Sequence, residues 1–148
     1  MDFKAFEESL LAYFQNNLAT KLDQGVPPPV LFLLDLPDVQ SKTETIIFYL
    51  YIPEYEFEQL TMESKALNAE VNIFVTFQGV GVSNATLGNI AKSYMKALYA
   101  LIESNKTLGG IVDNTSCEKI HYYDAVFGIP SGKAIEMLIR VEKEVGLI

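Results

Sequence analysis

The stretch from Phe77 to Gly110 constrains the fold most, because it reads as a strand end, a glycine turn, an amphipathic helix and a double-glycine stop. Ser83, Asn84 or Thr86 can cap the start of this helix, since their side-chain oxygens accept hydrogen bonds from its first N–H groups. The glycines at its end accept the left-handed conformation of a helix exit. The predicted buried stripe consists of Leu87, Ile90, Ala91, Tyr94, Leu98, Leu101 and Ile102.

A second amphipathic helix is predicted at the start of the chain. Its apolar residues recur at spacings of three and four, which places them on one helix face. Asp2 is the predicted N-cap, and Gly25 followed by Pro27-Pro28-Pro29 ends the helix. The predicted inward residues are Phe3, Phe6, Leu10, Phe14, Leu18 and Leu22.

Two short runs, Val30 to Leu36 and Thr45 to Ile52, are apolar almost throughout and rich in branched and aromatic residues, which favours strands. A strand with one wet face alternates apolar and polar residues, and these two do not. Something must therefore cover both faces. Because only two helices are predicted, we expect a second copy of the chain to contribute to that cover.

The remaining segments complete the sheet. Val71 to Phe77 alternates as a strand, apart from Phe74, and Glu118 to Phe127 with Lys133 to Val145 forms a hairpin. Glu54 to Glu70 stays open between a helical turn and a mobile acidic flap. The predicted fold class is α+β, in the order α-β-β-β-α-β-β, with two helices packed on a largely antiparallel sheet.

The length and the net charge of the chain limit the number of domains and the kinds of partner that it can have. The 148 residues suit a single domain spanning 1–148, and the net charge of −8 argues against nucleic-acid or membrane surfaces as partners. One cysteine, Cys117, excludes an internal disulfide. The first residues lack an apolar signal-peptide core, so we expect a soluble intracellular protein.

No residue set predicts catalysis. Gly79-x-Gly81 is followed by Asn84 where a dinucleotide fingerprint needs its third glycine. His121 and Cys117 would lie about 13 Å apart on an extended strand, too far for a hydrogen bond. One histidine with one cysteine also makes no zinc set. We therefore expect no catalytic, cofactor or metal site, and no enzyme activity.

Aromatic residues on strands are the candidate functional residues. Several of them cannot all face the core, and half-exposed aromatic side chains are enriched at protein interfaces. Ordinary strand propensity is the competing explanation. The predicted oligomer or partner interface consists of Tyr49, Tyr51, Tyr55, Phe57, Tyr122 and Tyr123.

The order of elements, with a second helix reading SYMKALYALIES into NKTLGGIVDN, resembles the tail terminator (tail-completion, head–tail joining) proteins of long-tailed bacteriophages. The resemblance implies a structural virion protein without enzyme activity or cofactor. It implies a ring of six copies that caps the tail tube, with the tail tube protein and the head-connector protein as partners. It also implies assembly in the cytoplasm of the bacterial host, followed by incorporation into the virion.

An acidic secretion chaperone is the alternative. Such proteins are similar in size, acidity and element order, and they hold an effector segment on apolar patches as dimers. They usually finish with a third helix, whereas this chain ends within a few residues of a strand pattern. A two-fold dimer would favour the chaperone, and a ring would favour the tail protein.

Overall fold

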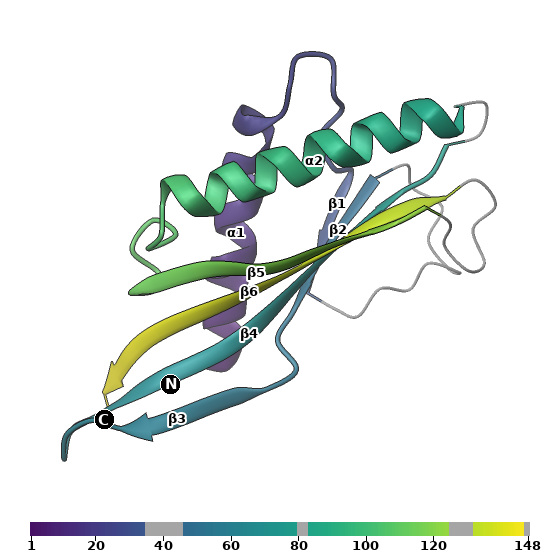
Figure 1. Cartoon of the computed structure of the whole chain (residues 1–148). Helices are drawn as coiled ribbons and strands as arrows, with labels where there is room; N and C mark the ends of the chain where they lie inside the picture. The colour runs from purple at the N-terminus through teal and green to yellow at the C-terminus, as the bar shows by residue number, and fades with distance from the viewer. Residues whose placement is uncertain (35–45, 80–82, 125–131, 147–148) are drawn as a thin grey trace.

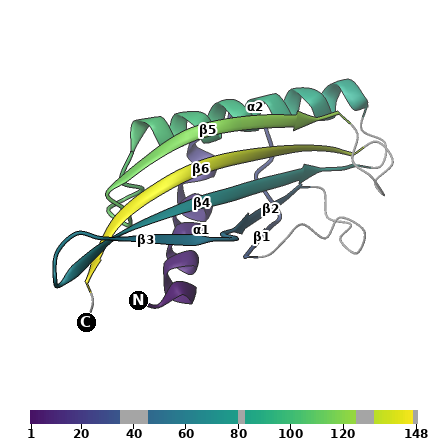
Figure 2. The ribbon, with the colours of Figure 1, turned by 60° about the horizontal axis from the view of Figure 1, so that its bottom comes forward.

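The computed structural model describes residues 1–34, 46–79, 83–124 and 132–146. Two helices lie on one face of a single six-stranded sheet (Figures 1 and 2), which confirms the α+β class. The elements are α1 (Phe3–Lys21), β1 (Leu31–Leu33), β2 (Ile46–Tyr51), β3 (Tyr55–Gln59), β4 (Ser64–Phe77), α2 (Asn84–Ser104), β5 (Asn114–Tyr123) and β6 (Lys133–Gly146).

The segment from Glu54 to Glu70 contains a hairpin, so the predicted order of three strands before the second helix is wrong by one strand. β3 pairs antiparallel with the first half of β4, in register from Tyr55 opposite Ala69 to Gln59 opposite Lys65. Neither the helical turn nor the mobile flap is found there. The apolar residues of this segment alternate across the hairpin, which is the period of a strand and not of a helix.

The strand order is β1-β2-β4-β6-β5, with β3 beside the first half of β4. Only β1 and β2 run parallel, so the prediction of a largely antiparallel sheet is confirmed. β6 lies between β4 and β5, which means that the strands flanking α2 are not neighbours. Within the described residues, β4, α2 and β5 therefore do not form the adjacent βαβ unit that a dinucleotide fingerprint requires.

Helix α1 begins as predicted, because the Asp2 carboxylate accepts a hydrogen bond from the Ala5 N–H at 3.0 Å. The helix covers the β1–β2 side of the sheet, where the rings of Phe14 and Phe48 lie 5.5 Å apart. Phe3, in contrast, is 42% exposed at the start of the helix. The predicted residues that are buried are Phe6, Leu10, Phe14 and Leu18.

Helix α2 covers the β5–β6 side and is capped by Ser83, whose hydroxyl accepts from the Thr86 N–H. Tyr94 anchors its middle, with its ring 4.9 Å from that of Phe77 and its hydroxyl donating to the Pro27 carbonyl at 2.6 Å. The helix ends at Ser104, and Gly109 lies in the turn that follows, where its φ of 73° is the left-handed conformation predicted for this glycine. The two helices and the sheet thus enclose one continuous core.

Strand β2 is buried on both faces within the single chain. Phe48 faces α1, while Ile47 and Tyr49 on the other face are each only 1% exposed. The expectation that a second copy is needed to cover this strand is therefore wrong. The adjacent β1 is half-buried at its three residues, and residues 35–45, which include the end of the predicted first strand, lie outside the described part of the chain.

Candidate protein interface on the open face of the sheet

The sheet has two unequal faces. Both helices lie behind it in Figure 2, and no described helix covers the face turned toward the viewer. We call this side the open face. Strand register places Tyr49, Phe74, Glu136 and His121 in one row across β2, β4, β6 and β5. The neighbouring row runs through Tyr51, Asn72, Leu138 and Lys119.

Aromatic side chains gather in the middle of the open face. The Phe74 and Tyr123 rings lie 5.9 Å apart, and the His121 and Tyr123 rings 4.3 Å apart. We call Tyr51, Phe74, His121, Tyr123 and Leu138 the aromatic patch. His121 is exposed and the other four are half-buried, so each keeps surface that a partner could cover.

Glu136 lies within the aromatic patch and shapes its electrostatics. The Tyr123 hydroxyl donates to Glu136 Oε1 at 3.4 Å. Burial and then the Glu136 charge raise the pKa of Tyr51, and the pKa of Tyr123 is raised for the same two reasons. Both phenols therefore stay protonated near neutral pH and keep a donor for a hydrogen bond. The patch combines apolar area with polar tips, as protein interfaces do.

The far part of the open face, toward the β3–β4 hairpin, is acidic. Arg140 donates to Glu118 Oε1 at 2.8 Å, and both side chains are partly exposed. This bond, with the more distant Glu70 and Glu56, raises the pKa of Arg140. The open face thus changes from aromatic to charged along the strands, which limits an apolar contact to the aromatic patch.

The six predicted interface residues do not form one surface. Tyr51 and Tyr123 lie on the aromatic patch, whereas Tyr49 is buried beside it. The other three face the helices: Tyr55 and Phe57 lie against Phe3 at ring distances of 4.7 and 6.3 Å, and Tyr122 lies against α2. The interface role of these residues stays a prediction. Only Tyr51 and Tyr123 belong to the aromatic patch, whereas Phe57 is 43% exposed on the helix side.

Sequence reasoning missed three members of the aromatic patch. Phe74 broke the alternation of its strand, and that irregularity was the available signal, because an apolar residue at a polar position faces away from the core. Leu138 is a second such position in β6. The third, His121, is polar and gave no such signal; it lies on the open face opposite Glu136.

Cys117 and His121 cannot act together. A bulge between Cys117 and Lys119 shifts the register of β5, so Cys117 pairs with Ile139 on the helix side while His121 pairs with Glu136 on the open face. Burial raises the pKa of the Cys117 thiol, which opposes thiolate formation. Within the described ranges no three histidine, cysteine or carboxylate side chains are placed to hold a metal ion.

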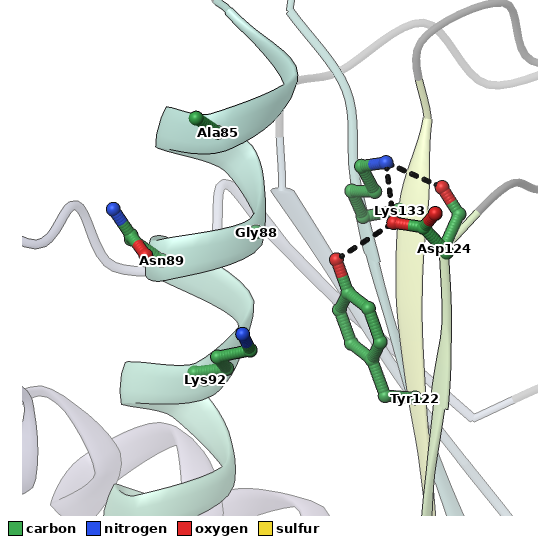
Figure 3. A pocket seen from close by; sticks show the side chains of 7 residues that line it. All are labelled: Ala85, Gly88, Asn89, Lys92, Tyr122, Asp124 and Lys133. Carbon is green, nitrogen blue, oxygen red and sulfur yellow. Dashed lines mark hydrogen bonds and ion pairs between the residues drawn. The ribbon is translucent and has the colours of Figure 1, made fainter.

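A polar hollow of about 440 Å³ lies between the first turns of α2 and the ends of β5 and β6 (Figure 3). Lys133 is 6% exposed and donates to Asp124 Oδ1 at 2.8 Å and to the Asp124 carbonyl. That contact lowers the pKa of the Asp124 carboxyl, and Tyr122 also donates to it at 3.4 Å. The lysine is thus already paired, and the cluster ties two strand ends together.

Among the described helices, neither α1 nor α2 has a stretch long and apolar enough to cross a membrane.

No protein-family model matches the chain, and no curated protein matches it. Among solved structures, it is similar to the sheath/tube terminator of PVC, an extracellular contractile injection system, in the extended state, with 13% identity and a TM-score of 0.46. The match covers 95% of this chain and 57% of the terminator, so the chain spans little more than half of that protein's length. It is also similar to a chain of the virion of a native gene transfer agent particle, with 9% identity and a TM-score of 0.41. That match covers 88% of this chain and 94% of the virion chain.

Proposed function

We propose that this chain is a structural subunit of a phage-like tail, which associates with copies of itself into a ring and terminates the tail tube. The observation that carries the proposal is the aromatic patch on the open face. Half-buried aromatic and aliphatic side chains, grouped across four strands with tyrosine hydroxyls at their edge, suit a protein contact.

The resemblance in element order gives the proposal its specific form: six copies, the tail tube protein on one side and the head-connector protein on the other. The role of ending a tube is the one named for the PVC terminator. A net charge of −8 is compatible with a ring through which DNA slides without binding, because like charges repel. Assembly in the host cytoplasm and residence in the virion belong to the same proposal, as does the absence of enzyme activity.

The full chain tests the ring directly. Light scattering and native mass spectrometry over a range of concentrations should show a cyclic oligomer, and negative-stain images should show a ring. A strict monomer at high concentration would contradict the proposal. A two-fold dimer would contradict it in favour of the acidic secretion chaperone.

A variant pair tests whether the aromatic patch makes the contact. Tyr123→Lys places a charge where apolar area should be buried, so we expect the oligomer to dissociate while thermal unfolding changes little. Tyr99→Lys is the matched control, because Tyr99 is 50% exposed on α2, on the side of the molecule away from the open face. Equal assembly of both variants would remove the patch from the interface.

A further inference from the structure

The helix side of the molecule carries a second apolar surface, at the end near the β3–β4 hairpin. Phe3 and Phe57 contact each other there and are 42% and 43% exposed. Leu60 and Met62, in the hairpin turn, are 50% and 94% exposed. Exposed apolar residues grouped in this way mark a contact site more often than isolated ones do.

The hairpin turn is ordered although it exposes these side chains. We call residues 60–63 the tip. The N–H groups of Leu60 and Thr61 both donate to the Ser64 carbonyl, at 3.1 and 3.2 Å. The Thr61 hydroxyl bonds the Ser64 hydroxyl and accepts from the Glu63 N–H, and the Gln59 amide donates to the Thr61 carbonyl. A turn held by its own hydrogen bonds presents Met62 at little entropic cost.

A hollow of about 320 Å³ lies on the same side, between the start of α1 and the sheet. It is lined by Met1, Asp2 and three residues of α1 (Ala5, Phe6 and Ser9), together with Ile111 and Lys143. The Lys143 ammonium donates to the Ile111 carbonyl at 2.7 Å, and no described carboxylate forms an ion pair with it. The hollow thus has mainly apolar walls with one lysine and one carboxylate, and that carboxylate, Asp2, already accepts a hydrogen bond from the Ala5 N–H.

We propose that the tip of one copy inserts into this hollow of the next copy, with Met62 on the apolar wall and Glu63 toward Lys143. This inference rests on the proposed ring. Charge complementarity argues for a second copy as occupant: neither Glu63 nor Lys143 has an ion pair among the described residues, and each can supply the opposite charge for the other, since the Asp2 carboxylate in the hollow already caps α1. A flexible methionine fills an irregular apolar space well.

The proposed contact is head-to-tail. Figures 1 and 2 show the hairpin turn at the far end of the sheet, beyond the start of α1. Tip and hollow are different surfaces of one chain, so each copy that accepts a tip still has its own tip free. Such a heterologous contact continues from copy to copy and closes into a ring when the rotation allows it.

Cross-linking tests the contact with the full chain. In a Cys117→Ala background, Met62→Cys combined with Ser9→Cys should form disulfides between chains under mild oxidation by diamide, giving a ladder of covalent oligomers. Met62→Cys with Asn89→Cys, on α2, is the matched control and should give no ladder. A ladder in the control alone, or a single dimer band from Met62→Cys by itself, would overturn the proposed pairing.

Substitutions at Met62 and at the Glu63–Lys143 pair test the apolar and the charged parts of the contact. We expect Met62→Asp to weaken association by about tenfold or more, since it removes a buried apolar side chain and places a charge against the apolar wall. Glu63→Lys should also weaken it, and adding Lys143→Glu should restore it, with thermal unfolding as the check on folding. If the double variant remains folded but does not regain association, the proposed ion pair between Glu63 and Lys143 is contradicted.

The two proposals fail differently. If the wild type forms a ring that Tyr123→Lys disrupts, but the tip variants assemble normally and no ladder forms, the tip contact is wrong and the ring stands. If the wild type forms no oligomer at any concentration, the proposed function is wrong and the tip contact is wrong with it.

Discussion

The two faces of the sheet are built from the same strands and differ in what they bury. On the helix side, the residues that β2, β4 and β6 contribute to the core are buried and apolar, and the lysines Lys133 and Lys143 lie toward the two ends of β6. On the open face, the same strands carry buried residues beside β1, then the half-buried aromatic patch, then charged residues toward the hairpin. The helix side therefore determines folding, and the open face retains surface for a partner.

The physical basis for self-association also differs from the one that the sequence suggested. The apolar early strands suggested that a second copy was needed to bury them, but β2 is buried within one chain. The proposed self-association rests instead on the aromatic patch and the exposed hairpin tip. Both surfaces lie outside the core, so altering them should change assembly more than folding.

The largest expected effect is on the helix side. Phe14 is fully buried, with its ring 5.5 Å from that of Phe48 and 5.4 Å from that of Tyr13. Phe14→Ala leaves a cavity and should lower the free energy of unfolding by about 3–5 kcal/mol. Urea denaturation measures this. A loss below about 1 kcal/mol would mean that the core tolerates the cavity.

The matched substitution on the open face should have a smaller effect on folding. Phe74 is half-buried and contacts Tyr123, so Phe74→Ala should lower the free energy of unfolding by only about 1 kcal/mol. Its dissociation constant for self-association should rise by about tenfold or more. If Phe74→Ala destabilises as much as Phe14→Ala, the distinction between the faces is lost.

Gly88 tests the contact between α2 and β5. An added Cβ would lie 3.1 Å from the Tyr122 hydroxyl, so Gly88→Ala should raise the free energy of unfolding little in the wild type. In a Tyr122→Phe background the hydroxyl is absent, and the same change should stabilise by about 1 kcal/mol through helix propensity. Thermal unfolding of the wild type, the two single variants and the double variant gives the coupling free energy between the two substitutions. Equal gains in both backgrounds would show that the tyrosine moves aside freely.

The smallest effect concerns acid stability. Lys133 lowers the pKa of Asp124 in the folded state, so the charged carboxylate contributes stability above its unfolded pKa of about 4. That contribution is lost as the pH falls through the folded pKa. Asp124→Asn should be slightly less stable than the wild type at pH 7, and the difference should shrink below pH 4. A constant difference across this range would contradict the linkage.

Local patterns predicted most of the elements. The helical spacing before Gly25 and after Ser83, the caps and the left-handed Gly109 all follow from interactions within a few residues. The β3–β4 hairpin was missed because β3 is an acidic strand that is exposed at every residue after Tyr55, and such a strand has a weak alternating pattern. Its partner strand supplies the hydrogen bonds that decide its conformation.

The sequence by itself determined two amphipathic helices, an apolar sheet and the absence of a recognisable catalytic motif, because helix periodicity and side-chain chemistry are local properties. Only the tertiary structure decided which aromatic residues share a face. The bulge after Cys117 and the register of β2, β4, β6 and β5 bring Tyr51, Phe74, His121, Tyr123 and Leu138 together. Strand register depends on contacts between segments far apart in the chain, and a shift of one residue would turn each side chain to the opposite face.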